Sequence, residues 1–513
     1  MSQPFNRLFS WIASHRVWLT LAIAWGFVLR AGYLNHGIPY GVGVDEPAIM
    51  GRVVQMMRSG DYHPHFFDYP TLYIYLQLFV GIARFLWGAM VGEWRALASA
   101  PPEAFYLWGR SLTVLFGTAT IVLVYRIGRR WSEWHGVLAA GLLAVLPSAV
   151  RESHFVLTDT PLTFFTTLTL LLSLRALEEP GLARFVLAGA AVGLASATKY
   201  PGVLSVVMPI AVASLVAAPA GVRLSRIAAV LVSCVAAFAL AAPYTFLDLP
   251  AFLDGFAYLS GSYSGPNPNV WLTYLIHLRL TLGWPASVLA LGGLVLATAR
   301  CVAGPDRLRW FVLASFPVVY VLMLVAQGGL VYGRYILPMV PPVCLLVGCA
   351  AIPLISALRF PPAGTRGRAV AAALALVILL PPASRTVDWL ATMAKGTTSQ
   401  LLVQWLERNV PAGTRLVYES GGGGIQFPEN RFRLSHIHRL ASRSYEDYLA
   451  AGDEYLIASS AAFQPAMAAQ RENPALALGY IELFRRTEPV AIILPTKDYL
   501  GSEYRVLAVR RLP

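Results

Sequence analysis

The stretch TDTPLTFFTTLTLLLSLRALEEPGLARFVLAGAAVGLASATKY, residues 158–200, decides the fold class of this chain. Its two apolar runs, which begin near residues 161 and 183, are separated by a short connection that carries Arg175 and Arg184. Each run approaches the roughly 20 residues that a helix needs to cross a bilayer. Asp159 precedes the first run and Lys199 follows the second. The stretch therefore predicts two membrane helices, with basic residues at one membrane face and an Asp and a Lys at the other.

The same pattern extends over most of the chain. Of the 513 residues, 57% are hydrophobic and 13% are charged, whereas about a quarter of the residues of a soluble domain are charged. Only 14 of the 27 acidic residues precede Asp388, and the other 13 lie in the last 126 positions. This division predicts a membrane domain, residues 1–386, and a water-soluble domain, residues 387–513. Apolar runs begin near residues 17, 71, 106, 135, 161, 183, 201, 226, 276, 310, 335 and 369.

The basic residues between the runs indicate how the chain is inserted, because loops on the cytoplasmic side carry an excess of Lys and Arg. If residues 71–92 lie in the interface and do not cross, the loops of one face hold 15 basic residues. From the second crossing onward, the opposite inter-helix loops then hold only Arg151, Lys199 and Arg334. We therefore predict eleven crossings, one interfacial helix, and a C-terminal domain outside the cell. The net charge of +13 follows from this topology and does not indicate nucleic-acid binding.

The last 126 residues have the pattern of a small α/β domain. Residues 400–408 form an amphipathic stretch, and a turn follows at Pro411 and Gly413. Short strand-like runs cover residues 415–418, 455–458, 490–494 and 504–509.

Polar residues collect in the connections of the predicted outer face. Polar and charged side chains cost free energy when they are buried near a bilayer, so such residues are commonly functional. The fourth outer connection, residues 244–271, is a long polar insert rich in Gly, Ser and Asn. The other outer connections carry Asp45, Glu46, Asp61, His63, His65, Asp68 and Tyr69 (first), Arg151, Glu152, His154 and Asp159 (second), Lys199 and Tyr200 (third), and Tyr332, Arg334 and Tyr335 (fifth).

This set of residues suits the transfer of a sugar from a lipid phosphate. A carboxylate can take the proton from an acceptor hydroxyl as that oxygen attacks the anomeric carbon. Cations then stabilise the departing phosphate, with Arg binding its oxygens as a fork and Lys acting as a point charge.

Several of these residues, and Arg110 near the outer end of the run that begins near residue 106, also have a structural interpretation. Asp45 and Glu46 could start a helix, and Asp159, before Pro161, could cap one. Lys199 and Arg334 could be snorkelling anchors at helix ends. The two histidines of the first connection could be ordinary loop residues, and Arg110 could pair with a carboxylate within the helix bundle.

Eight short motifs follow one another along residues 17–386: Val44-Asp45-Glu46, Gly60-Asp61, Tyr69-Pro70-Thr71-Leu72-Tyr73, Trp108-Gly109-Arg110-Ser111, Thr158-Asp159-Thr160-Pro161-Leu162, Thr198-Lys199-Tyr200-Pro201-Gly202, Pro243-Tyr244 and Arg334-Tyr335-Ile336-Leu337-Pro338. In these motifs the chain resembles the GT-C glycosyltransferases, in particular the protein O-mannosyltransferases and the bacterial aminoarabinose transferases of lipid A. In one respect it departs from them: the aminoarabinose transferases carry Lys-Pro-Pro-Leu where this chain has Asp68-Tyr69-Pro70-Thr71-Leu72, so a phosphate-binding cation is absent here.

The resemblance implies roles for these residues. Asp45 is the expected base, Glu46 supports it, and Asp159 is a second acidic catalytic residue. The expected contacts to the donor phosphate come from Lys199, Arg334 and Arg110. The remaining expected substrate-binding residues are His63, His65, Asp68, Tyr69, Arg151 and Tyr335.

The sequence thus predicts an inverting hexosyl- or pentosyltransferase of the bacterial plasma membrane, which takes sugar from a polyprenyl-phosphate donor at the outer face. The acceptor is a hydroxyl of a lipid, glycan or protein, and no cofactor is required with certainty, although a divalent cation is possible. Two alternatives are a lipid or glycan transporter or flippase, which would need polar residues at the bilayer midplane, and a non-catalytic assembly scaffold.

Overall fold

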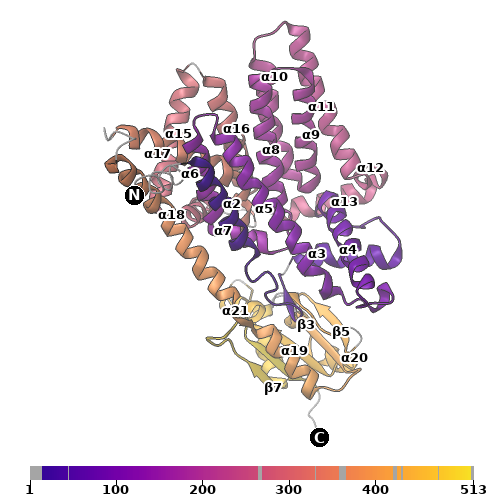
Figure 1. The fold of residues 1–513 in the computed structure, drawn as a ribbon. Coiled ribbons are helices and arrows are strands. Elements are labelled where there is room, and N and C mark those ends of the chain that lie inside the picture. Colours follow the sequence, from indigo (N-terminus) through magenta and orange to yellow (C-terminus); the bar gives the residue numbers. More distant parts are fainter. Residues whose placement is uncertain are drawn as a thin grey trace. The chain divides into compact units, whose positions relative to one another are not determined.

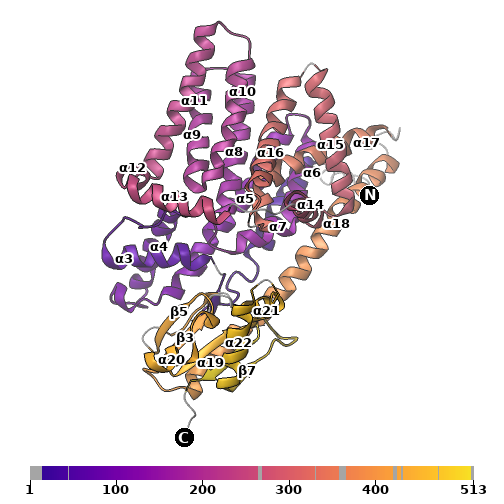
Figure 2. The same ribbon diagram turned by 180° about the vertical axis from the view of Figure 1, so that it is seen from behind.

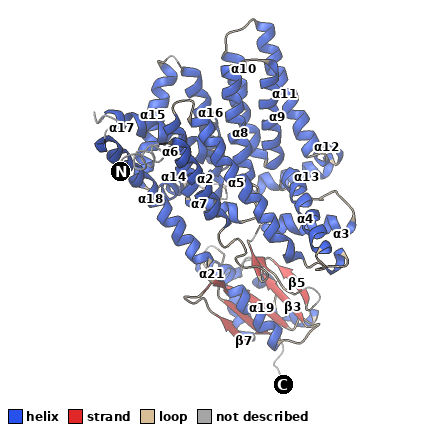
Figure 3. Cartoon of the chain, in the orientation of Figure 1, coloured by secondary structure: helices blue, strands red, loops and turns tan. Residues whose placement is uncertain are grey.

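The computed structural model describes residues 14–43, 45–263, 269–304, 306–329, 331–357, 365–419, 424–428, 431–471 and 473–509. The chain divides into two compact units. The membrane unit comprises Met1–Leu34, Arg52–Arg84 and Trp108–Trp389, and the sheet unit comprises Asn35–Gly51, Phe85–Leu107 and Leu390–Pro513. Helices build the membrane unit, and the long strands belong to the sheet unit (Figures 1 and 3).

The membrane unit confirms the predicted polytopic helical fold, since each of the twelve apolar runs lies on a helix or on two successive helices. Some of these helices continue into the sheet unit. The α-helices are α2 (His15–Ala31), α3 (Glu46–Ser59), α4 (Leu72–Met90), α5 (Tyr106–Gly128), α6 (Glu133–Val145), α7 (Pro147–Arg151), α8 (Asp159–Glu178), α9 (Leu182–Thr198), α10 (Val207–Leu215), α11 (Ala220–Ala241), α12 (Tyr244–Leu247), α13 (Leu249–Tyr263), α14 (Val270–Leu282), α15 (Trp284–Val302), α16 (Arg307–Gln327), α17 (Val340–Ala357) and α18 (Thr365–Met393). Short 3₁₀ segments include η3 (Glu152–His154), η4 (Tyr200–Val206) and η5 (Gly333–Met339).

Length and apolar composition identify the helices that could cross a membrane. Among the described residues, eight helices are long and apolar enough to cross a membrane, or nine if α6 and the bent segment after it form one span. Helix α4, predicted to lie in the interface, is one of the eight. Leu182–Thr198, Tyr200–Leu215 and Val270–Leu282 are apolar but shorter. The eleven crossings and the interfacial placement therefore stay predictions.

The break between α6 and α7 shows how the bundle satisfies backbone groups away from water. The chain bends by 61° there, and Pro147 has no N–H with which to continue the α6 ladder. The buried Arg30 side chain donates to the carbonyl oxygens of Leu143 (3.0 Å) and Ala144 (2.9 Å). The Thr386 hydroxyl donates to the carbonyl of Val145 at 2.7 Å. These bonds replace the ones that the end of α6 loses.

Glycines allow α9 and α11 to pack closely. A β-carbon on Gly189 would collide with Ser233 and the backbone of Val230, and one on Gly193 would collide with the backbone of Cys234. Small residues four positions apart commonly allow such close packing between membrane helices. This packing fixes α9, whose C-terminal end leads to Lys199.

The sheet unit contains a five-stranded sheet with the order β5-β3-β6-β9-β7. Its strands are β3 (Arg415–Glu419), β5 (Arg433–Ile437), β6 (Tyr455–Ser459), β7 (Glu488–Ile493) and β9 (Tyr504–Ala508). Strand β3 runs parallel to β5 and β6, and β9 runs antiparallel to β6 and β7. The four strands predicted for residues 387–513 are all present, the amphipathic stretch at residues 400–408 is helical, and the predicted α/β fold of this region is confirmed.

Helices cover both faces of this sheet (Figures 1 and 2). On one face, α19 (Thr398–Asn409) packs Leu402 and Leu406 against a core that includes Leu416 of β3. Neighbouring Val417 points to the opposite core, because successive side chains of a strand alternate between faces. That core is closed by α20 (Tyr445–Ala451), α21 (Ser460–Ala468) and α22 (Pro474–Arg486).

A buried carboxylate ties three elements of the sheet unit together. Glu419, at the end of β3, accepts hydrogen bonds from the backbone N–H groups of Leu440 (2.8 Å) and Ser459 (2.8 Å) and from the Tyr480 hydroxyl (2.6 Å). Burial raises the pKa of Glu419, and these three hydrogen bonds oppose the shift.

We expect Glu419→Gln to destabilise the sheet unit by about 1–3 kcal/mol, the cost of leaving a buried donor unpaired. An amide has only one acceptor oxygen, so its NH₂ group must face one of these three donors. Thermal unfolding of the full chain in detergent measures the effect. Glu488→Gln, at an exposed position of β7, is the matched control; equal stability of the two variants would contradict the prediction.

Candidate active site

The membrane unit brings a carboxylate and two cations together at the ends of three helical segments. Asp159 is the first residue of α8, Lys199 links α9 to η4, and Arg334 lies in η5. The Lys199 ammonium lies 2.8 Å from Oδ1 of Asp159, and Nε of Arg334 lies 3.7 Å from Oδ2. The three residues come from the predicted second, third and fifth outer connections, so the structure brings these connections together.

The local sequence explains why these side chains meet. Helix α9 stops at Thr198, and Lys199 is extended with φ −156° and ψ 132°. Lys199 is the N-cap residue of η4, and Pro201 lies in the first turn of that segment, where its missing N–H costs no hydrogen bond. Gly202 then lies so close to the backbone of Ala195 that a β-carbon would collide with it. The η4 segment can therefore fold back along α9, and Lys199 is held at the point of reversal.

A second ion pair interacts electrostatically with the group formed by Asp159, Lys199 and Arg334. Arg151 and Glu152 form an ion pair at 2.6 Å, and the Glu152 side chain is only 4% exposed. Glu152 interacts electrostatically with both Asp159 and Arg334. The group therefore contains two carboxylates and three cations, and its formal charge is +1.

The cations of this group are more exposed than the carboxylates. The exposed fraction of the side chain is 47% for Arg151, 19% for Arg334 and 13% for Lys199, against 3% for Asp159. A ligand arriving from solvent would therefore meet positive groups first. This arrangement favours an anion and fits a phosphate.

Aromatic rings surround the two cations nearest Asp159. The Lys199 ammonium lies 4.5 Å from the centre of the Tyr335 ring and 6.0 Å from that of Tyr69. The Arg334 guanidinium lies 4.5 Å from the centre of the Tyr332 ring. Ring faces attract cations and limit their motion. Tyr69 also brings the predicted first outer connection to the site.

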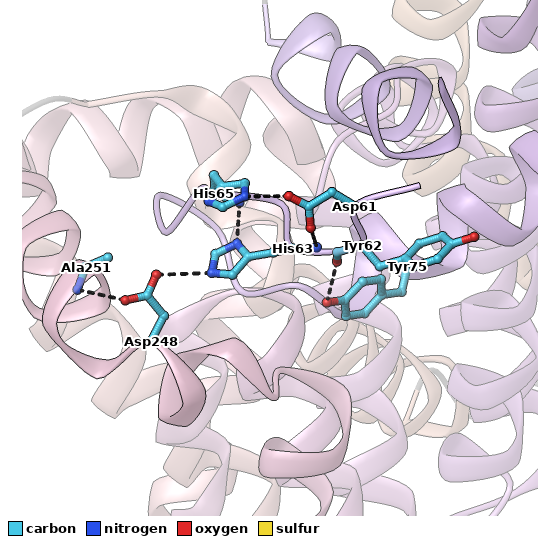
Figure 4. A network of polar contacts seen from close by, with 7 residues as sticks. All are labelled: Asp61, Tyr62, His63, His65, Tyr75, Asp248 and Ala251. Atoms are coloured by element: carbon cyan, nitrogen blue, oxygen red, sulfur yellow. Dashed lines mark hydrogen bonds and ion pairs between the residues drawn. The ribbon is translucent and has the colours of Figure 1, made fainter. Parts of the chain in front are cut away.

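The first connection contacts the polar insert through His63 (Figure 4). His63 pairs with Asp248 of the insert at 3.1 Å, and His65 pairs with Asp61 at 2.9 Å. Asp68 is half-buried; burial raises the pKa of its carboxyl, and the charge of Arg52 opposes this shift. The predicted substrate-binding residues His63, His65, Asp68 and Tyr69 thus belong to one loop of the membrane unit.

Asp45 and Glu46 belong to the sheet unit. Glu46 begins α3 and is fully buried, and its Oε2 accepts a hydrogen bond from the N–H of Gly43 at 2.6 Å. Such a bond from a carboxylate to an upstream amide is typical of a helix N-terminus. The partly buried Asp45 directly precedes the helix. The backbone contact suits Glu46 for a supporting role rather than a chemical one.

Arg110 is buried in the membrane unit. Its Nη1 donates to the carbonyl of Leu34 at 2.8 Å, and its guanidinium lies 5.7 Å from the centre of the Phe155 ring. These contacts give it a structural function, and its predicted contact with a donor phosphate stays a prediction.

Two residues of this region were missed as site residues from the sequence. Glu152 follows Arg151 in the same outer connection, so its position was a usable signal. Asp248 carried no such signal, because its partner His63 lies 185 positions away in the sequence. Within the described part of the chain, no group of three or more His, Cys, Asp or Glu side chains is arranged to hold a metal ion.

Comparisons with known proteins agree with this fold. Residues 107–246 match the family described as dolichyl-phosphate-mannose-protein mannosyltransferase. No curated protein sequence matches the chain significantly.

Solved structures extend the likeness to nearly the whole chain. ArnT from Cupriavidus metallidurans, bound to undecaprenyl phosphate, is 14% identical with a TM-score of 0.55 over 98% of both chains. The oligosaccharyltransferase of Archaeoglobus fulgidus in its apo form is 12% identical with a TM-score of 0.60, over 91% of this chain and 71% of that one. AglB from Archaeoglobus fulgidus, in complex with an inhibitory peptide and a dolichol-phosphate, is 12% identical with a TM-score of 0.58, over 90% and 71%.

At these identities the structural likeness shows the fold. Together with the family match over residues 107–246, it confirms the predicted resemblance to the GT-C glycosyltransferases of the O-mannosyltransferase and ArnT type.

Proposed function

We propose that this protein transfers a sugar from a polyprenyl-phosphate donor to an acceptor hydroxyl at the outer face of the bacterial plasma membrane. The observation that carries the proposal is the group formed by Asp159, Lys199 and Arg334. In this group a buried carboxylate holds two cations that are more exposed than the carboxylate itself. Structures with this fold contain undecaprenyl phosphate or dolichol-phosphate, and the matching family is named for a dolichyl-phosphate sugar.

In this proposal Lys199 and Arg334 bind the donor phosphate. Lys199 supplies a compact charge and Arg334 a planar fork for two phosphate oxygens. Asp159 was predicted as a second acidic catalytic residue. Its 2.8 Å contact with Lys199 favours a different role, which is to hold the two cations in place. Arg151 and Tyr335 also belong to the proposed phosphate-binding site, and Arg110 supports this site from within the helix bundle.

Asp45 is the proposed base, and Glu46 supports it. The Asp45 carboxylate takes the proton of the acceptor hydroxyl, and the oxygen forms a bond to the anomeric carbon. The bond from that carbon to the phosphate oxygen breaks, and polyprenyl phosphate leaves with the electron pair. A single displacement of this kind inverts the anomeric configuration. His63, His65, Asp68 and Tyr69 lie on the loop proposed to contact the substrates.

The substrates themselves can be identified in cells. Mass spectrometry of lipid-linked sugars and envelope glycans, with and without the protein, should show accumulation of one polyprenyl-phosphate sugar and loss of one glycan. Unchanged lipid-linked sugars would contradict the proposal.

The proposal places residues 387–513 outside the cell, and cysteine labelling tests this. In a background without the four native cysteines, Lys497→Cys should react with an impermeant thiol reagent added to intact cells, because Lys497 is exposed in the sheet unit. Glu179→Cys, exposed between α8 and α9 on the predicted cytoplasmic side, should react only after permeabilisation. The reverse result would overturn the eleven-crossing topology.

A further inference from the structure

The polar insert is joined to the first outer connection through Asp248. This residue ends α12 and precedes α13, and its Oδ1 lies 3.4 Å from the backbone N–H of Ala251. Its other oxygen, Oδ2, lies 3.1 Å from Nε2 of His63 (Figure 4). A carboxylate that binds one ring nitrogen of a histidine fixes the tautomer and the orientation of the ring.

The protonation of His63 follows from its two partners. Its Nδ1 lies 2.7 Å from the backbone nitrogen of His65, and a backbone N–H can only donate. Nδ1 therefore carries a lone pair, and the proton is on Nε2, where it is donated to Asp248. Only a neutral imidazole can donate from one nitrogen and accept at the other. The titratable groups that face His63 are Asp248, Asp61, the stacked His65 ring 4.0 Å away, and the Tyr244 ring at 4.1 Å.

This network holds the loop in an unfavourable backbone conformation. His65 has a φ of +46°, a left-handed conformation that is uncommon for residues other than glycine. The bond from its N–H to His63 opposes this cost, and so does the 2.9 Å contact of its Nε2 with Asp61. The hydrogen bond from His65 lowers the pKa of Asp61. The turn is therefore ordered by its side chains.

The same loop continues to the cation pair. Phe67 packs edge-on against Phe252 of α13. Phe67 also contacts Gly255, where an added β-carbon would lie 3.0 Å from the Phe67 Cβ. The Tyr200 hydroxyl donates to the carbonyl of Phe67 at 2.8 Å. Tyr200 directly follows Lys199, and Tyr69 lies beside the Lys199 ammonium. The position of the loop is thus coupled to the position of Lys199.

We propose that Asp248 and His63 are positioning residues for the phosphate-binding cations: with His63 neutral, they fix the turn at residues 61–65 and hold the loop against α13 and Lys199. The inference rests on the proposed function, because it assigns phosphate binding to Lys199.

The first test uses Asp248→Ala, with Asp254→Ala at an exposed position of α13 as the matched control. Hydrogen exchange of the purified protein should show faster exchange over residues 61–69 in Asp248→Ala alone. Its affinity for undecaprenyl phosphate should fall about threefold to tenfold, the equivalent of roughly one hydrogen bond. Unchanged exchange would overturn the proposal, and so would faster exchange with full affinity.

The second test removes the acceptor for the His65 N–H. His63→Phe keeps a flat ring without a nitrogen, so exchange at the His65 amide should be at least about threefold faster than in the wild type at the same pH, the equivalent of one lost hydrogen bond. His438→Phe, at an exposed position of the sheet unit, is the matched control and should leave this exchange unchanged. Equal exchange in His63→Phe and the wild type would overturn the role of His63. Neither exchange measurement needs a substrate, so a failure of wild-type sugar transfer would overturn the proposed function alone.

Discussion

Asp45→Asn is expected to lower turnover by a factor of about 10² to 10⁴, because an acceptor hydroxyl is a poor nucleophile until a base takes its proton. This factor corresponds to roughly 3–5 kcal/mol of transition-state stabilisation. Asparagine keeps the size and shape of the side chain, so membrane insertion and thermal stability should stay near those of the wild type. The measurement is transfer of radiolabelled sugar from total polyprenyl-phosphate sugars in reconstituted membranes, normalised to folded protein.

Glu46→Gln distinguishes a structural role of Glu46 from a direct role in proton transfer. Glu46 is fully buried and bonded to the Gly43 amide, so its replacement should affect stability more, relative to turnover, than Asp45→Asn does. If Asp45→Asn keeps full turnover while Asp159→Asn abolishes it, the two acidic residues have the opposite roles. If both keep full turnover, the enzymatic interpretation of this face is wrong.

Lys199→Met is expected to remove most donor binding and to destabilise the membrane unit. Removing one partner of a buried ion pair costs about 3–5 kcal/mol, since a charge is left without compensation. The Asp159 side chain is 3% exposed and Lys199 is its partner at 2.8 Å, but Arg334 at 3.7 Å should keep the cost near the lower limit. Thermal unfolding and undecaprenyl phosphate binding in detergent measure the two effects.

The double variant Asp159→Asn/Lys199→Met distinguishes stability from binding. It removes both charges, so it should recover much of the stability lost in Lys199→Met without recovering donor binding. Lys395→Met, at an exposed lysine of the sheet unit, is the control and should affect neither. Full donor binding by the double variant would contradict phosphate binding by Lys199 and leave it as an anchor for its helix end.

Much of the fold could be predicted because hydropathy is a local property of the sequence. The apolar runs became helices, and the alternating runs after Asp388 became strands of the sheet. Breaks within an apolar run were harder to predict from the sequence. The run beginning near residue 276 is two helices, α14 and α15, separated at Gly283, whose φ of +76° is a backbone conformation available mainly to glycine.

The candidate site could be predicted in part for a different reason. Asp159, Lys199 and Arg334 lie at helix ends that the distribution of basic residues assigned to one face, and the structure brings all three together. Sidedness does not determine distances within that face, so the ion pairs of Asp159 and the His63–Asp248 contact could not be foreseen. Both pairs depend on loops whose paths are set by tertiary packing, as at Gly202 and Phe67.

The most direct test of the central claim follows one lipid in liposomes that contain the purified protein, radiolabelled polyprenyl-phosphate sugars and acceptor membranes. We expect the wild type to release free polyprenyl phosphate in step with the appearance of label on an acceptor, and Asp45→Asn to release almost none. Movement of label across the bilayer on unchanged lipid, with no polyprenyl phosphate released, would contradict the account and identify a transporter.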